Sequence, residues 1–129
     1  MWYHFTERFF GEKTMETLEY RNGIYEGETK NGVPHGVGRL TWENGVYYEG
    51  EFVNGEYHGN GRMFVSDYAY YEGQWSGGQF TGRGRVSYSG GQVHEGEFLN
   101  GKLHGLGKVT LENGDTVEGI WENGILKNG

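Results

Sequence analysis

The sequence predicts an all-β protein: an elongated single-layer, twisted antiparallel sheet of tandem β-hairpins with a degenerate N-terminal cap. Three observations carry this prediction. They are a fixed period of 23 residues, alternation of apolar and polar residues, and turn dipeptides between the alternating segments. Periods of 20–50 residues are typical of repeat architectures. Period-two alternation bounded by Asn-Gly or Gly-Gly pairs is typical of strands joined as hairpins.

Residues 48–70 show the repeat most clearly. In Tyr48-Glu49-Gly50-Glu51-Phe52 the two rings share one face of a strand and the two glutamates share the other. Asn54-Gly55 supplies the positive φ angles of a tight hairpin turn. The return segment, 57–65, also alternates, and its apolar face carries Tyr57, Gly59, Gly61, Met63 and Val65. Each repeat is therefore expected to be one β-hairpin.

The period divides the chain into an array and a cap. Residues 25–129 form the array, with repeats at 25–47, 48–70, 71–93 and 94–116 and a half-repeat at 117–129. In this half-repeat Ile120 replaces the Glu or Gln of earlier repeats, so both faces are expected to be covered there. Residues 1–24 read as a degenerate repeat or cap. Trp2, Phe5 and Phe9 also fit one face of a short amphipathic helix, and the hairpin is slightly favoured.

Glycine at two positions of each return strand indicates how such a sheet covers its apolar face. A single sheet has no second layer to pack against. Glycine inside a strand often marks the close approach of another group to the backbone. We therefore expect large rings from nearby strands to lie over bare backbone at positions such as Gly59 and Gly61.

Composition narrows the class of protein and of partner. The chain has 129 residues, a formal net charge of −7 and no cysteine, so no disulfide framework or thiolate zinc site is expected. No run of about 18 apolar residues would span a membrane, and the start lacks the pattern of a secretory signal. A cytoplasmic location is the expectation. Negative charge disfavours nucleic acid and anionic membrane surfaces as partners.

The string YEGEFVNGEYHGNGRM, residues 48–63, resembles the MORN-repeat family. The resemblance covers about residues 20–129. It implies antiparallel hairpins stacked into an elongated, curved sheet, in proteins that act mainly as scaffolds and accessory regions. Members occur in junctophilins, in plant phosphoinositide kinases, beside a SET methyltransferase domain and as small proteins bound to myosin tails. The sequence departs from the family pattern at Thr29, Asp67-Tyr68, Gly77-Gly78, Thr81 and His94.

Candidate catalytic and metal-binding patterns fail on spacing. His35, His58 and His104 recur in separate repeats, and equivalent positions of adjacent two-strand repeats lie about 10 Å apart, too far to share an ion. The glutamates that recur in each repeat lie in near-identical surroundings, so their pKa values are not expected to differ as general acid–base catalysis by two carboxyl groups requires. Gly36-Val37-Gly38 is followed by a strand and not by the helix that a phosphate cradle needs. No enzyme activity, metal or cofactor is expected.

The favoured function is a non-enzymatic interaction module or scaffold that binds a segment of a protein partner along a concave aromatic face. The expected anchors are Tyr48, Phe52, Tyr57, Tyr71, Trp75 and Phe80. One alternative is self-association into a homodimer or filament through a sheet end, at 117–121 or at the N-terminal aromatics. A second is peripheral membrane or phosphoinositide recognition. Tyr47, Phe64 and Tyr70 form a non-periodic aromatic excess on the otherwise polar face.

Overall fold

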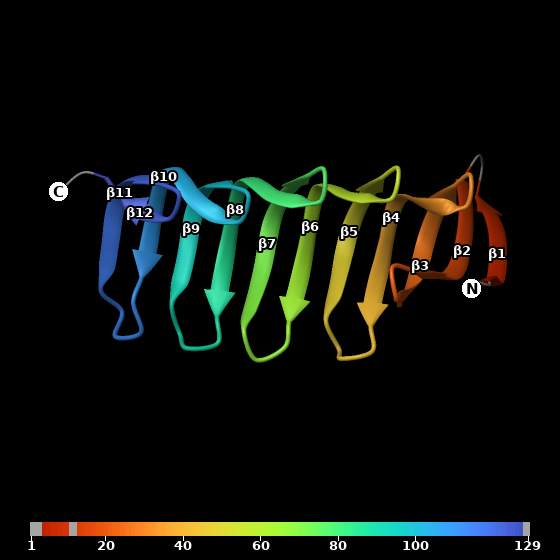
Figure 1. Ribbon diagram of the computed structural model, residues 1–129, viewed down its shortest axis with the longest axis horizontal. Helices are drawn as coiled ribbons and strands as arrows, with labels where there is room; N and C mark the ends of the chain where they lie inside the picture. Colours follow the sequence, from red (N-terminus) through yellow and green to blue (C-terminus); the bar gives the residue numbers. More distant parts are fainter. Residues whose placement is uncertain (1–3, 11–12, 128–129) are drawn as a thin grey trace.

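The computed structural model describes residues 4–10 and 13–127, and it shows a single 12-stranded antiparallel sheet in which each strand neighbours the next in sequence. Figure 1 shows the strands in one layer, from the N-terminal end in red to the C-terminal end in blue. The strands are β1 (His4–Phe10), β2 (Lys13–Tyr20), β3 (Gly23–Lys30), β4 (Val33–Trp42), β5 (Tyr47–Val53), β6 (Glu56–Val65), β7 (Ala69–Ser76), β8 (Gln79–Tyr88), β9 (Val93–Leu99), β10 (Lys102–Thr110), β11 (Thr116–Glu122) and β12 (Ile125–Leu126). The predicted fold class is confirmed.

Each hairpin of the array contains a break in register halfway along. Gly50 pairs with Gly61, but the next residue, Glu51, pairs with His58, whereas an unbroken ladder would place it opposite Asn60. The return strand thus carries two extra residues, one of which, Gly59, has a φ of 63°. The same break recurs in β3–β4, β7–β8 and β9–β10. Bulges of this kind bend a strand and increase its twist.

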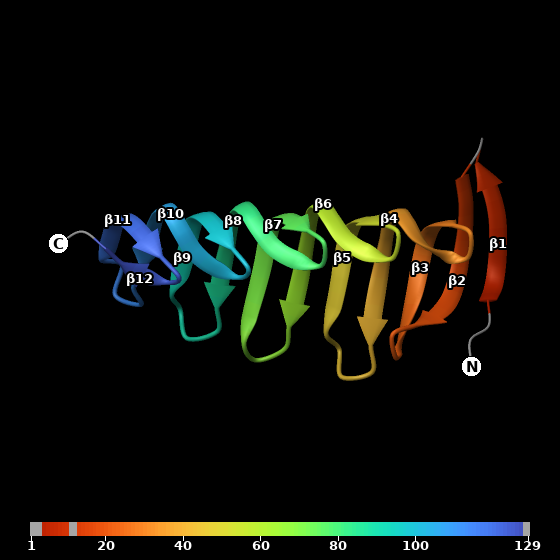
Figure 2. The ribbon, with the colours of Figure 1, turned by 45° about the horizontal axis from the view of Figure 1, so that its top comes forward.

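The bend folds the tip of each hairpin over the apolar face of the sheet. Figure 2 shows the tips, rotated toward the viewer, lying across the strands that carry them. Tyr57, just after the Asn54-Gly55 turn, stacks on Tyr48 of the sheet with ring centroids 4.1 Å apart. Successive tips are also tied to one another, because the Gly55 N–H donates to the Pro34 carbonyl at 2.8 Å and the Gly78 N–H donates to the Tyr57 carbonyl at 3.1 Å.

The core lies between the sheet and the folded tips. Buried residues occur in each of the four full repeats, and in three of these repeats they come from both strands of the hairpin. The core consists of Leu18, Tyr25, Leu40, Tyr48, Phe52, Ala69, Trp75, Phe80, Val86, Phe98, Leu103 and Val109. A single sheet therefore builds an interior without a second layer, because half of each hairpin acts as the cover.

The N-terminal segment is a hairpin and not a helix. β1 and β2 pair antiparallel, and their register slips between His4↔Leu18 and Glu7↔Glu16. β2 then pairs with β3 in the register of the later repeats, with Glu16 opposite Gly27. The favoured prediction is confirmed for residues 4–10 and 13–24, while Trp2 lies outside the described residues.

One expectation about the C-terminal end is wrong. The side chain of Ile120 in β11 is 45% exposed, and that of its register partner Leu106 is 60% exposed. The folded tips cover only the apolar face, and Ile120 points to the other face. Among the described residues, no helix is long and apolar enough to cross a membrane.

Candidate functional site

The apolar face in the middle of the array is built from interlocking rings. Tyr48 meets Phe52 edge to face at 5.0 Å, stacks on Tyr57 at 4.1 Å and meets Trp75 edge to face at 5.3 Å. Edge-to-face and offset-stacked pairs contribute about 0.5–1.5 kcal/mol each beyond their area burial. The ring positions are therefore fixed by one another across β5, β6 and β7.

Tyrosine rings lie over the second glycine of the pair, as the sequence predicts, whereas the first glycine, such as Gly59, faces the Glu51 carboxylate and not a ring. A Cβ added to Gly61 would lie 2.2 Å from the Tyr48 hydroxyl oxygen, and a Cβ added to Gly38 would lie 2.1 Å from that of Tyr25. The Tyr48 hydroxyl donates to the Glu51 carbonyl at 2.8 Å, so the polar end of the buried ring has a partner. Burial raises the pKa of Tyr48 and of Tyr25 far above that of a free phenol.

The six predicted anchors divide into two groups by exposure. Four are core residues in the isolated chain: Tyr48 at 0% exposure, Phe52 at 1%, Phe80 at 4% and Trp75 at 6%. Tyr57 and Tyr71 are half-buried and pack against that core. The face that a partner can reach without opening the hairpins therefore includes Tyr57 and Tyr71, while the other four support it from below.

A tyrosine outside the predicted set extends this face toward β8 and β9. Tyr68, in the loop between β6 and β7, is 53% exposed and meets Tyr88 edge to face at 5.7 Å. Tyr88 in turn lies 4.8 Å from the ring of His94. Burial raises the pKa of Tyr71 to about 12, with a further contribution from Tyr68. The departure of Asp67-Tyr68 from the repeat pattern is the sequence signal for this extension.

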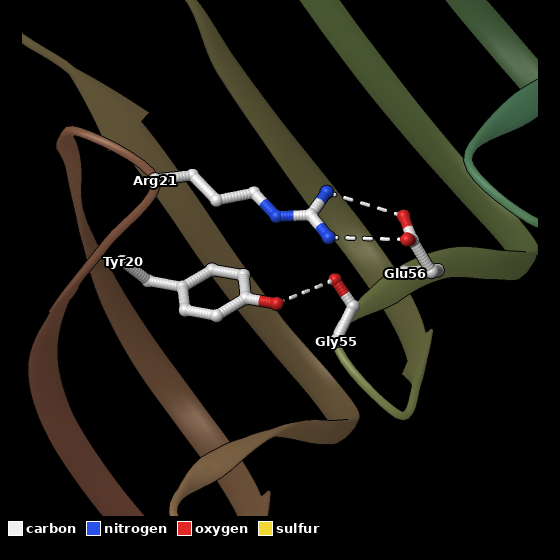
Figure 3. A network of polar contacts seen from close by, with 4 residues as sticks. All are labelled: Tyr20, Arg21, Gly55 and Glu56. Carbon is white, nitrogen blue, oxygen red and sulfur yellow. Dashed lines mark hydrogen bonds and ion pairs between the residues drawn. The ribbon is translucent and has the colours of Figure 1, made fainter.

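A polar clasp crosses the face at its N-terminal end. The Tyr20 hydroxyl donates to the Gly55 carbonyl at 3.2 Å. Beside it, the two terminal nitrogens of Arg21 donate to the two carboxylate oxygens of Glu56 at 3.1 and 3.0 Å (Figure 3). This pair lowers the pKa of Glu56 through the hydrogen bonds from Arg21. The clasp joins the β2–β3 turn to a hairpin tip 35 residues further along the chain.

Comparison with protein-family profiles finds MORN repeat matches at residues 25–47, 48–66, 71–93 and 94–116. These four tandem matches cover most of the hairpins described above. The chain belongs to the MORN-repeat family. Comparison with curated proteins finds no match. MORN repeats are non-enzymatic modules that generally mediate interactions with proteins or membranes.

Two of the three MORN histidines, His35 and His104, hold turns. The ring nitrogen Nδ1 of His35 accepts from the Asn54 N–H at 3.1 Å, and that of His104 accepts from the Asn123 N–H at 3.3 Å. Thr81 fills the same role with its hydroxyl, at 3.0 Å from the Asn100 nitrogen. Within the part of the chain that the structure describes, no group of three His, Asp or Glu residues could hold a metal ion.

The second acidic residue of the MORN motif holds the bulge. A Glu51 carboxylate oxygen accepts from the Asn60 N–H at 2.9 Å, and the Gln74 amide oxygen accepts from the Arg83 N–H at 2.7 Å. The N–H groups freed by the break in register are thus satisfied by side chains of the facing strand. An uncharged Gln serves at one site, so the repeat needs an acceptor here and not a charge.

The polar face carries the ion pairs and the non-periodic aromatics. Glu49 accepts from Arg62 at 2.6 Å and also lies 3.8 Å from Arg39. The ring of Phe64, which is 37% exposed, lies 5.7 Å from that of Tyr47. It lies 6.5 Å from the ring of Tyr70 on the other side. The structure thus brings the three predicted aromatics together, on the face opposite the candidate site.

Proposed function

We propose that this MORN-repeat protein is a non-enzymatic binding module that holds a segment of a protein partner along its concave aromatic face. The observation that carries the proposal is the half-buried row of Tyr57, Tyr71 and Tyr88, which packs on the rigid core yet stays accessible. Exposed apolar patches rimmed by polar residues mark interaction sites, and tyrosine is a frequent anchor at interfaces.

The rigid support beneath the row favours binding over catalysis. Rings locked by neighbours lose little conformational freedom when a partner arrives, which reduces the entropic cost of association. The half-buried side chains on the face are phenols, indoles, a thioether and an aliphatic group, which provide contact area and hydrogen-bonding tips. This chemistry suits recognition of a side-chain pattern on a peptide or helix.

The proposal is tested by selecting peptides on the wild-type chain from a displayed library. Selected peptides are then titrated against Tyr57→Ala, Tyr71→Ala and, as a matched control, Phe64→Ala. We expect the first two variants to weaken binding at least tenfold and the Phe64 variant, whose ring lies on the polar face, to bind like wild type. Circular dichroism and thermal melts verify folding of each variant. Peptides that bind all three variants with wild-type affinity would refute the proposal.

Self-association is a second candidate, favoured by the pair Leu106 and Ile120 on the polar face. These side chains are 60% and 45% exposed and face each other across β10 and β11. An exposed apolar pair near the end of a sheet is a potential contact between copies. Light scattering of wild type and of Leu106→Lys tests this. A monomer at all concentrations up to about 500 µM, in both proteins, would end the idea.

A further inference from the structure

The loops that join successive repeats carry unpaired negative charge along one border of the aromatic face. These loops are residues 43–46, 66–68, 89–92 and 112–115, and they contain no lysine or arginine. Four exposed carboxylates stand in them, here called the loop rim: Glu43, Asp67, Glu112 and Asp115. None of these four forms an ion pair with any residue that the structure describes.

An apolar row lies directly beside the rim, at the base of the same loops. Trp42, Tyr88 and Leu111 are half-buried, and their N–H groups close the loops by bonding to the carbonyls four residues on, at 2.8–2.9 Å. Glu43 and Glu112 immediately follow Trp42 and Leu111 in the chain. Each of these two loops therefore presents an apolar base next to a carboxylate.

We propose that the occupant of this face is a basic amphipathic helix of the partner. The inference rests on the proposed function and names the chemistry of the partner segment. Its apolar stripe lies on the row at the loop bases, and its lysine or arginine side chains point to the loop rim. Charge complementarity supports this choice, because the chain is acidic overall at −7 and no rim carboxylate forms an ion pair within the described part of the chain.

The repeat spacing sets the spacing of the cations. Successive repeats lie two strand spacings apart, about 10 Å. Seven residues of an α-helix rise about 10.5 Å and return to nearly the same side of the helix after two turns. Three residues of an extended strand also cover about 10 Å, but they place the third side chain on the opposite face. A helix with basic residues every seven positions therefore matches the spacing of the loops, three of which carry the rim carboxylates while 89–92 carries none, and an extended strand does not.

The test uses a synthetic 21-residue helical peptide with lysine at every seventh position beside a leucine stripe. A control peptide has the same composition with the lysines spaced five residues apart. Binding is measured by calorimetry at 50 and 300 mM NaCl. It is repeated with the rim variant, Glu43→Gln/Asp67→Asn/Glu112→Gln, and with Glu26→Gln/Glu72→Gln/Glu118→Gln, which removes the same charge from the polar face.

We expect the seven-spaced peptide to bind wild type and the polar-face variant equally, and to bind the rim variant about tenfold more weakly with a reduced salt dependence. Equal affinity of the two peptides, equal affinity for the rim variant, or no saturable binding at 1 mM would each overturn the inference. If library peptides depend on Tyr57 and Tyr71 but not on the rim, the charge inference fails and the proposed function stands. If they depend on neither, both fail.

Discussion

Substitution of Gly61 by alanine probes the contact on which the interior of this single-layer sheet depends. The new Cβ would lie 2.2 Å from the Tyr48 hydroxyl oxygen and 2.5 Å from Cζ of the same ring. Tyr48 has little room to retreat, because it is fully buried, stacks on Tyr57 and meets Trp75 edge to face. Its hydroxyl would also be drawn from the Glu51 carbonyl.

The expected cost is about 3 kcal/mol of unfolding free energy, of which overpacking contributes about 2 and the lost hydrogen bond about 1. For a chain of 129 residues this lowers Tm by roughly 10 °C. Urea unfolding and thermal melts measure both quantities. The matched control is Gly90→Ala, since Gly90 is an exposed loop residue whose added Cβ would have its nearest neighbour, a Glu112 oxygen, at 3.4 Å.

Gly90→Ala is expected to leave stability unchanged or raise it by a few tenths of a kcal/mol. A double-mutant cycle sharpens the test, because in a Tyr48→Val background the cost of Gly61→Ala falls as the clashing ring is removed. If Gly61→Ala costs less than about 0.5 kcal/mol, or costs the same in the Tyr48→Val background, the ring-over-glycine account is refuted.

Three further predictions concern single contacts. Burial lowers the pKa of His94 in the folded chain. The unfolded chain therefore binds a proton at higher pH than the folded chain, and the free energy of unfolding falls as the pH drops below about 6.5. His94→Tyr should reduce this pH dependence, which is measured as the difference between the urea midpoints at pH 7.5 and 5.5. Arg21 and Glu56 are about half exposed, so a double-mutant cycle with alanine at both positions should give a coupling energy of about 0.5 kcal/mol. Salt should screen an ion pair at the surface, so a coupling energy that is unchanged in 0.5 M NaCl would contradict this prediction. Glu51→Gln should preserve thermal stability, because Gln74 accepts the equivalent hydrogen bond in its own repeat. Glu51→Ala should cost about 0.5–1.5 kcal/mol, because it removes the acceptor of the exposed Asn60 N–H.

The sequence predicts the repeat unit, the hairpin turns and the pairing of rings with glycines, because each depends on local chemistry. Asn54-Gly55 specifies its turn through backbone angles. The fold of the tip over the sheet was not predicted. His58-Gly59-Asn60-Gly61 keeps the period-two alternation, so the insertion of two residues leaves no trace in the pattern of faces.

This hidden bend explains why four of the six predicted anchors are buried and not exposed. Without the fold of the tip, Tyr48 and Phe52 would lie on an open apolar face, whereas in the structure they lie beneath the tip. The long-range pairing of Arg21 with Glu56 could not be predicted from the sequence either, because these two charged residues meet only through the stacking of repeats. Ile120 was expected to be covered because it is apolar, but it is exposed, so an apolar side chain alone does not show that another part of the chain packs on it.

The most direct measurement of the proposed binding face is site-specific photo-crosslinking to a selected partner peptide. A benzophenone side chain is introduced at position 68, where Tyr68 is 53% exposed beside Tyr88, and in a second protein at position 64 on the polar face. Binding along the aromatic face predicts that the peptide crosslinks from position 68 and not from position 64. A peptide that crosslinks from position 64 alone would contradict it.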